Sequence, residues 1–220
     1  MTSPSSPPAC VVLGGGGHAR VVIDALRVSG AAIPHAVLDR NPGLWGKDVD
    51  GVPVLGADDL LAQLAGQGIT WFVMGLGGVG DNSPRQRLFE LGLRHGLQPL
   101  TVRHPSAVCS TSATIGAGST LAPLAVVNAG ATVGRNVIVN SGAIVEHDCQ
   151  VDDHAHIATG AQPASTVRVG AGAHIGAGST VLQCLTIGAG AIVGAGAVVV
   201  ADVHPGAVVI GVPAREHRRR

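Results

Sequence analysis

Aliphatic residues recur at every sixth position through the second half of the chain. The row begins at Ile115 and ends at Val199, and Pro163 is its one interruption: Ile115, Leu121, Val127, Val133, Val139, Val145, Val151, Ile157, Pro163, Val169, Ile175, Val181, Ile187, Val193 and Val199. A second row of small or medium-sized side chains runs from Ser119 to Val203, and each of its residues comes four positions after a residue of the first row. In an α-helix a step of six residues advances roughly 240°, so both rows would spread around every side of the helix.

Along an extended chain the two rows face the same side, because steps of four and six residues are both even. The pattern therefore predicts short strands joined by tight corners, which is typical of a parallel β-helix built from hexapeptides. With three hexapeptides in each triangular coil, residues one full coil apart stack one strand spacing above each other, roughly 4.8 Å. The register shows no insertion from 115 to 204 and predicts about five unbroken coils.

The chain before residue 104 has a different rhythm, in which apolar strands alternate with helical patterns. We expect strands at 9–13, 36–38 and 71–74 and helices at 19–28, 58–64 and 83–94. This order predicts a small Rossmann-like parallel sheet with helices on its faces. The predicted domains are an α/β domain at residues 1–104 and a β-helix with a C-terminal tail at residues 105–220.

Composition excludes several classes of partner. Lys+Arg and Asp+Glu balance at 14 each, which argues against nucleic acid or an anionic membrane surface as a partner. No apolar run approaches a membrane span, the N-terminal segment lacks a signal-peptide pattern, and we expect a solvated basic tail at 218–220. The four cysteines match no zinc or redox spacing, so we expect reduced thiols in a cytoplasmic protein: Cys10, Cys109, Cys149 and Cys184.

Four consecutive glycines follow the first predicted strand and open the first helix. Bare backbone N–H groups at Gly14–Gly17 and the helix N-terminus predict a phosphate cradle, to which His18 can add a donor. The same glycines with Asp39 also fit a weak dinucleotide fingerprint, although only about half of a doubly wound domain is present. A second glycine loop, at 75–80, ends the third strand on the same side of the sheet and is expected to line a substrate pocket.

Charge in the β-helix concentrates around one corner. His147 is flanked by Glu146 and Asp148, and Asn128 lies one coil below Glu146 as a potential hydrogen-bond partner. A carboxylate beside an imidazole raises its basicity and fixes its tautomer, which suits a general base. A solvated corner whose charge only keeps the protein soluble is the alternative interpretation of the same residues.

The hexapeptides, the ending Val209–Arg215 and the segment Gly14–Val22 together resemble the sugar O-acyltransferases of the sialic acid O-acetyltransferase group. Within that group the chain is most similar to acetyl-CoA-dependent N-acetyltransferases of nucleotide-linked 4-amino sugars. The resemblance implies a left-handed β-helix, a homotrimer, and acetyl-CoA bound as co-substrate in the groove between neighbouring subunits.

The resemblance also implies roles for individual residues. His147 matches the family's proposed base, and the catalytic set is Asn140, Glu146, His147 and Asp148. The set implied near acetyl-CoA is His156, Gly160, Ala161, Ser165 and His174. The set implied for the nucleotide sugar is Gly14, Gly15, Gly16, Gly17, His18, Asp39, Arg40 and Gly77. The segment 163–166 departs from the family, which commonly has Gly-Gly or Gly-Asn there, and leaves the Ser165 N–H as the candidate oxyanion donor.

Other interpretations remain open at this point. The same residues could acetylate a hydroxyl of sialic acid or of another sugar, and a binding or scaffold protein that has lost CoA would keep the fold. His156 and His174, which stack one coil apart, could simply pack at a subunit interface, and His154 is expected at the surface. A zinc site of three histidines from two subunits, as in a class of carbonic anhydrases, lacks an obvious ligand spacing, so no metal is expected. The sequence does not identify the nucleotide or the sugar.

Overall fold

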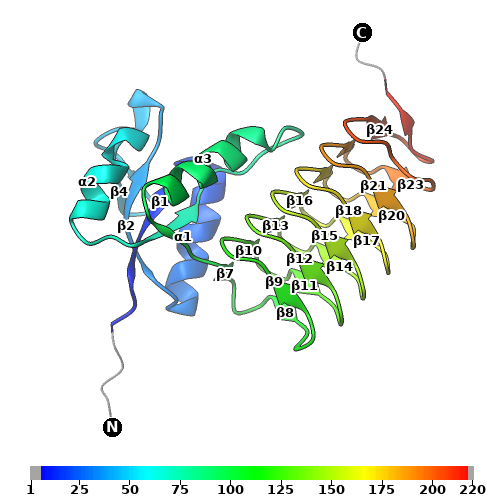
Figure 1. Cartoon of the computed structure of the whole chain (residues 1–220), viewed down its shortest axis with the longest axis horizontal. Coiled ribbons are helices and arrows are strands. Elements are labelled where there is room, and N and C mark those ends of the chain that lie inside the picture. The colour runs from blue at the N-terminus through cyan, green and yellow to red at the C-terminus, as the bar shows by residue number, and fades with distance from the viewer. Residues whose placement is uncertain (1–5, 218–220) are drawn as a thin grey trace.

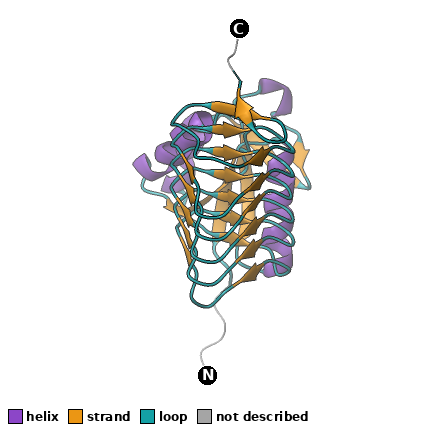
Figure 2. Cartoon of the chain, turned by 90° about the vertical axis from the view of Figure 1, so that its right-hand side faces the viewer, coloured by secondary structure: helices purple, strands orange, loops and turns teal. Residues whose placement is uncertain are grey.

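A computed structural model describes residues 6–217, so the first five residues and the basic tail at 218–220 lie outside it. The chain forms an α/β layer followed by a triangular coil of short strands (Figure 1). Figure 2, turned by 90° from the view of Figure 1, shows the successive coils stacked one above another, with their strands parallel. This architecture confirms the predicted fold class. Within the described residues, none of the helices has the length and apolar character needed to cross a membrane.

The α/β layer is one six-stranded sheet in the order β3-β4-β2-β1-β5-β6, parallel except where β3 meets β4. Its strands are β1 (Ala9–Leu13), β2 (Ile33–Leu38), β3 (Asp48–Val49), β4 (Val52–Gly56), β5 (Trp71–Met74) and β6 (Gln98–Pro99). Its helices are α1 (Gly17–Ser29), α2 (Leu61–Gly66) and α3 (Ser83–Arg94), with 3-10 turns η1 (Pro42–Leu44) and η2 (Asp58–Leu60). The three predicted strands and three predicted helices are all present, whereas β3, β4 and β6 were missed.

The coil has three faces, which we name by the character of their outward side chains. The covered face, against which the α/β layer packs, holds β7 (Val102–Arg103), β10 (Thr120–Leu121), β13 (Ile138–Val139), β16 (His156–Ile157), β19 (His174–Ile175), β22 (Ile192–Val193), β24 (Val208–Ile210) and the antiparallel β25 (Arg215–Glu216). The apolar face holds β8 (Val108–Cys109), β11 (Val126–Val127), β14 (Ile144–Val145), β17 (Gln162–Pro163), β20 (Thr180–Val181) and β23 (Val198–Val199). The polar face holds β9 (Thr114–Ile115), β12 (Thr132–Val133), β15 (Gln150–Val151), β18 (Arg168–Val169) and β21 (Thr186–Ile187).

Both predicted rows of side chains point into the coil. From Leu121 to Val199 the aliphatic row is at most 2% exposed, and small side chains such as Ala125 and Ala131 fill the space between. Strands pair one full coil apart, as in the pairing of Thr132 with Gln150. Pro163 fits the row because the ladder uses the N–H groups of Gln162 and Ala164, so its missing N–H costs no hydrogen bond there.

The expectation of an unbroken register to residue 204 is wrong in the last coil. Ile187 pairs with Val203 and Ile192 pairs with Val208, so this coil is shorter than the three hexapeptides of the coils before it. Val203 therefore takes an aliphatic-row position, not the second-row position that the period predicted. The shortened coil keeps its core because the inward side chain still stacks on Ile187.

The α/β layer and the coil pack tightly against each other through α3 (Figure 1). The Phe89 ring lies 5.7 Å from the His154 ring in an edge-on arrangement, and Arg135 stacks over Phe89 at 5.4 Å. His154 Nδ1 also lies 2.8 Å from the Asn136 side-chain nitrogen. The expectation of a surface His154 is therefore wrong, since the residue is half-buried in this contact and burial lowers its pKa.

Candidate active site

His147 lies on an exposed corner of the coil, between the apolar and the polar face. Its Nδ1 is 2.9 Å from Asp148 Oδ2, and the two side chains are 55% and 62% exposed. The carboxylate accepts the proton on Nδ1 and so leaves Nε2 as the free basic nitrogen of a neutral imidazole. This pair has the geometry of a general base and its orienting carboxylate.

The backbone of the corner holds the pair in place. Asp148 has a left-handed backbone, with φ at 58°, where the coil below has Gly130. Aspartate tolerates that conformation better than most residues. Glu146 accepts the backbone N–H of His147 at 3.1 Å. Among the described residues, Asn128 makes no hydrogen bond to Glu146, so the partner expected from stacking is replaced by this local contact.

A second group of candidate residues lines a cavity of about 490 Å³ where the α/β layer meets the coil. We call it the junction pocket. Its lining combines the start of α1, the second glycine loop and two residues of the coil: Gly16, Gly17, His18, Val21, Gly75, Leu76, Gly77, Gly78, Val79, Asn140 and His156. The N-terminus of α1 thus faces the same space as the predicted coil residues, which suits an anionic ligand group.

A directed chain of hydrogen bonds crosses this junction. The Ser141 N–H donates to Asn140 Oδ1 at 2.8 Å, which turns the Asn140 amide nitrogen toward His156 Nε2 at 3.2 Å. His156 Nδ1 lies 2.9 Å from the Gly78 carbonyl, which can only accept a hydrogen bond. His156 is therefore the neutral tautomer with its proton on Nδ1.

Burial keeps this whole group of histidines neutral. Burial, with smaller contributions from the neighbouring His174, Arg85 and His18, lowers the pKa of His156 to about 3. Burial, with the Arg85 charge, also lowers the pKa of His18 to about 4 and shifts that of His174 downward. The predicted stacking of His156 and His174 is confirmed, with ring centres 5.0 Å apart.

Arg85 of α3 is the buried cation that adds to these downward pKa shifts. Its Nη1 donates to the Asn136 carbonyl, and its Nη2 donates to the carbonyls of His154 and Ala155 at 2.7 and 3.1 Å. Burial lowers the pKa of Arg85 to about 10, so the side chain stays charged at neutral pH. Within the described residues its charge faces carbonyl dipoles and no carboxylate.

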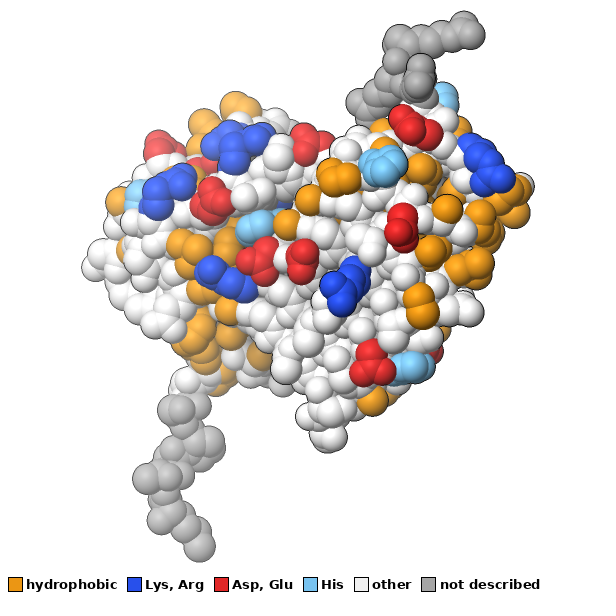
Figure 3. All heavy atoms as spheres, turned by 45° about the vertical axis from the view of Figure 1, so that its right-hand side comes forward, with side chains coloured by type: hydrophobic (Ala, Val, Ile, Leu, Met, Phe, Trp, Pro, Cys, Tyr) orange, Lys and Arg blue, Asp and Glu red, His pale blue; other side chains and the backbone are white. Residues whose placement is uncertain are grey.

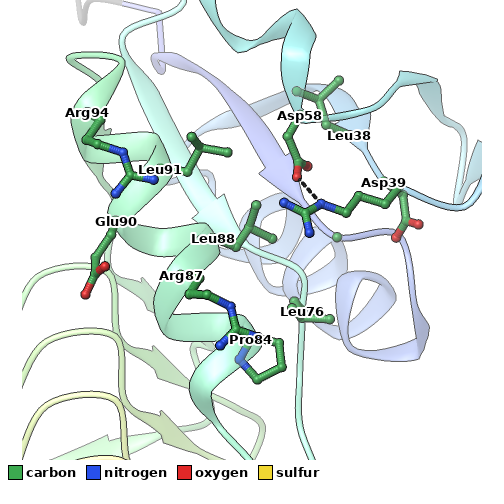
Figure 4. A pocket seen from close by; sticks show the side chains of 12 residues that line it. Leu38, Asp39, Asp58, Leu76, Pro84, Arg87, Leu88, Glu90, Leu91 and Arg94 are labelled. Carbon is green, nitrogen blue, oxygen red and sulfur yellow. Dashed lines mark hydrogen bonds and ion pairs between the residues drawn. The ribbon is translucent and has the colours of Figure 1, made fainter.

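A third region forms a cavity of about 540 Å³ at the carboxyl ends of the α/β strands (Figure 4). We call it the strand-end pocket. Its lining residues are Gly14, Leu38, Asp39, Arg40, Asp58, Leu76, Pro84, Arg87, Leu88, Glu90, Leu91 and Arg94. Ligands of open α/β sheets bind at this edge. Arg40 Nε pairs with Asp58 Oδ2 at 2.7 Å across the pocket.

The predicted nucleotide residues divide between the two pockets. Gly14, Asp39 and Arg40 line the strand-end pocket, whereas Gly16, Gly17, His18 and Gly77 line the junction pocket. Gly15 donates its N–H to Asp39 Oδ2 at 2.6 Å, and the Asn41 N–H donates to Asp39 Oδ1 at 2.8 Å. Asp39 therefore holds the glycine loop with Oδ2 and its own following turn with Oδ1.

The residues expected near acetyl-CoA are spread more widely. Ser165 stacks above His147, and its N–H has no partner among the described residues, in keeping with a free donor. The Ala161 side chain is fully buried, its N–H donates to the Ala158 carbonyl and its carbonyl accepts the Ile144 N–H. Gly160 donates its N–H to the Ser141 carbonyl.

The structure separates Asn140 from His147 within one chain. Asn140 lies at the corner between the covered and the apolar face, and His147 lies at the corner between the apolar and the polar face. The Asn140 side chain contacts His156 instead. Sequence reasoning also missed Asp58 and Arg85. An arginine among polar helix residues gives no signal that it will be buried, and Asp58 resembled a helix start.

Among residues 6–217, no group of three or more His, Cys, Asp or Glu side chains is arranged to hold a metal ion.

Comparison with known proteins identifies the family. The family described as PglD N-terminal domain matches residues 10–91. PerB from Caulobacter crescentus, solved with CoA and GDP-perosamine, is 39% identical, with a TM-score of 0.89 over 96% of this chain and 97% of that one. The chain belongs to the family of acetyltransferases that includes PerB, the perosamine N-acetyltransferase of Caulobacter crescentus.

Two further members of the family agree. The acetyltransferase domain of PglB from Neisseria gonorrhoeae, solved with acetyl coenzyme A, is 34% identical, with a TM-score of 0.87 over 96% of this chain and 100% of that one. The GDP-perosamine N-acetyltransferase of Escherichia coli is 33% identical over 84 residues, and that match spans 38% of each protein. Family membership is thus established over the α/β layer and the coil together.

Proposed function

We propose that the protein transfers acetyl from acetyl-CoA to the amine of a nucleotide-linked deoxy-amino sugar. The observation that carries the proposal is the His147–Asp148 pair at 2.9 Å on a fold whose relatives were solved with CoA and GDP-perosamine. We assign nucleotide-sugar binding to residues 1–104 and acetyl transfer to residues 105–220. We also propose the cytoplasm as its compartment, since Cys10, Cys109, Cys149 and Cys184 are free thiols.

The reaction needs one base and one oxyanion donor. The amine nitrogen attacks the thioester carbon while His147 Nε2 takes a proton from that nitrogen. Asp148 holds the resulting imidazolium, and the Ser165 N–H donates to the oxyanion. The carbon–sulfur bond then breaks, and His147 returns the proton to the CoA thiolate.

The corner above His147 supplies a surface for the CoA arm. Ala164, Leu182 and Val200 follow Glu146 at steps of one coil and stack on the same corner. Leu182 and Val200 are each 41% exposed. An apolar strip that ends above Glu146, beside His147, suits the flexible arm between the nucleotide and the thioester of CoA.

A second copy of the chain completes the site in this proposal. The outward residues of the polar face are all polar and exposed, whereas four strands of the apolar face present aliphatic side chains: Val108, Val126, Ile144 and Val198. Hydrophobic side chains gather along one side of the coil (Figure 3). An unpartnered apolar strip of this kind favours self-association.

Three-fold symmetry would join the two halves of the site. If three coils turn their apolar faces toward a common axis parallel to the coil, the His147 corner of one copy meets the Asn140 corner of the next. Because both corners belong to the same coil, rotation keeps them at one height. A homotrimer thus brings His147 to the junction pocket of a neighbour, which resolves their separation within one chain.

The test is turnover of GDP-perosamine and acetyl-CoA, followed by thiol release. Replacing His147 with Ala is expected to lower kcat by roughly 10²–10⁴-fold, the usual contribution of a general base. The matched control is His35→Ala, since His35 is exposed at the start of β2, away from both pockets. Turnover that survives in the His147 variant would remove this residue from the mechanism.

Acetylation of a sugar hydroxyl is the second candidate, because the same base would serve it. A panel of amino and hydroxy acceptors separates the two reactions. Faster thiol release with hydroxy acceptors would replace the amine in this proposal.

A further inference from the structure

Asp58 is the buried carboxylate of the strand-end pocket. The residue is 8% exposed, and its Oδ2 accepts from Arg40 Nε at 2.7 Å. Among the described residues, Oδ1 has no hydrogen-bond partner. The Arg40 side chain is itself 82% exposed and lines the pocket, so Asp58 holds one edge of a guanidinium that is otherwise open to solvent. Oδ1 keeps contact with solvent, so a donor group of a ligand in the pocket can reach it without displacing a protein partner.

Asp39 shows that this free acceptor is particular to Asp58. Asp39 lines the same pocket, but its two oxygens accept the N–H groups of Gly15 and Asn41. Asp39 therefore has its strongest acceptor positions filled by its own backbone surroundings. Asp58 is the carboxylate with an oxygen left for a ligand.

The position of Asp58 suits the base of a nucleotide. It follows β4, which lies beside β2 in the sheet, whereas the glycine loop follows β1 at the centre. In parallel α/β sheets, phosphates lie at the glycine loop and the rest of the nucleotide extends across the neighbouring strand ends. A phosphate at Gly14–Gly17 therefore places the base on the side of β2 and β4.

We propose that Asp58 selects a guanine base, and this rests on the proposed function. A carboxylate only accepts hydrogen bonds. Guanine presents two adjacent donors, N1–H and the N2 amino group, which can share the two lone pairs of the free oxygen Oδ1. Adenine presents an acceptor, N1, beside its single amino group, so it would set a lone pair against the carboxylate. Arg40, held by Asp58, lies flat along the base, and Arg94 of the same pocket offers donors to O6.

The experiment measures binding of GDP, IDP and ADP by calorimetry to the unmodified protein and to Asp58→Asn. GDP is expected to bind more tightly than IDP, which lacks the N2 amino group, and IDP more tightly than ADP. Asp58→Asn is expected to weaken GDP binding roughly 10–100-fold, the range for a bidentate base contact, and to leave ADP binding equal or tighter.

Asp59→Asn is the matched control, because it removes the same charge one residue away, at an exposed position outside the pocket. This variant is expected to bind GDP like the unmodified protein. Equal affinities for GDP and ADP, or an unchanged GDP affinity in Asp58→Asn, would overturn the role of Asp58 alone. If none of the three nucleotides binds, the selection of guanine by Asp58 falls, whereas the proposed function stands or falls separately with the turnover assay given for His147.

Discussion

Two groups of histidines in one coil domain occupy opposite environments. His147 stands on an open corner against Asp148, with more than half of its side chain exposed. His156 and His174 lie beneath the α/β layer, beside the Arg85 charge. The residue type is the same, but the exposed histidine is open to solvent, whereas burial holds the other two as neutral donors and acceptors.

The difference assigns different tasks to the two groups. A general base must take up a proton during each turnover, which a pKa of about 3 prevents His156 from doing near neutral pH. His156 instead connects Asn140 of the coil to Gly78 of the second glycine loop. In the proposed function, the buried group positions the second glycine loop and the exposed corner performs the proton transfer.

The strongest way to disturb the buried group is to remove Arg85. Arg85→Met removes the Arg85 donor from the carbonyls of Asn136 and His154, whereas the Ala155 carbonyl keeps the Ile138 N–H. We expect the free energy of unfolding to fall by about 3 kcal/mol. For a chain of this size that loss lowers Tm by roughly 6–12 °C in a thermal scan.

Arg87→Met is the control for this prediction, because Arg87 lies on the same helix with its guanidinium bonded to Ser83 Oγ at an exposed position. The Tm of Arg87→Met is expected to differ from that of the unmodified protein by no more than an ordinary surface substitution changes it. Equal stabilities of the Arg85 and Arg87 variants would show that α3 does not depend on the buried cation.

Acid should weaken the buried group before it affects the rest of the fold. His156 and His18 have pKa values of about 3 and 4 when folded, against 6.5 for the free side chain. Below pH 6.5 the unfolded chain binds protons that the folded chain excludes, so the free energy of unfolding falls as the pH drops toward about 4. Urea unfolding at unit steps between about pH 7 and pH 4 measures this slope.

His156→Asn sharpens the measurement, because asparagine keeps an N–H donor for the Gly78 carbonyl but does not titrate. The slope is expected to shrink in this variant and to stay unchanged in His35→Asn, which alters an exposed histidine. A slope that is the same in all three proteins would mean that His156 is not held neutral by burial.

The exposed corner should respond through activity, with little change in stability. Asp148→Asn keeps the shape and tolerates the left-handed backbone, but it loses the charge that orients His147. We expect kcat to fall at least about 10-fold with an unchanged Tm. Glu146→Gln, which still accepts the His147 N–H, is expected to change kcat less. The reverse order of the two variants would make Glu146 the orienting carboxylate.

The coil was predictable because its physics is local and repetitive. A period of six fixes which residues point inward, and Thr132 and Gln150 pair across one coil as the period requires. Where the chain departs from the period, as at Val203, the sequence gives no warning, because Val203 also fits the second row. The strand β4 escaped notice because its alternation of Val52 and Val54 with exposed residues is short.

The site was predictable only in part, because its contacts join segments far apart in the chain. Asp148 is adjacent to His147 in sequence, so their pairing follows from local geometry. Gly78 and His156, which are 78 residues apart, meet only because α3 docks on the covered face. Neither segment contains a sequence pattern that predicts this contact, and no pattern predicts the burial of Arg85 that accompanies it.

The central claim is that His147 works in the junction pocket of a neighbouring copy, and mixing two inactive variants tests it. One variant is His147→Ala. The other is Gly77→Leu, which projects a side chain into the pocket beside the His18 Cβ, 3.2 Å from the added Cβ. If the variants are unfolded and refolded together in equal amounts, random trimers restore about a quarter of the sites, and turnover should return to about a quarter of the unmodified rate. Turnover of the mixture that stays at the level of the separate variants would contradict a site shared between copies.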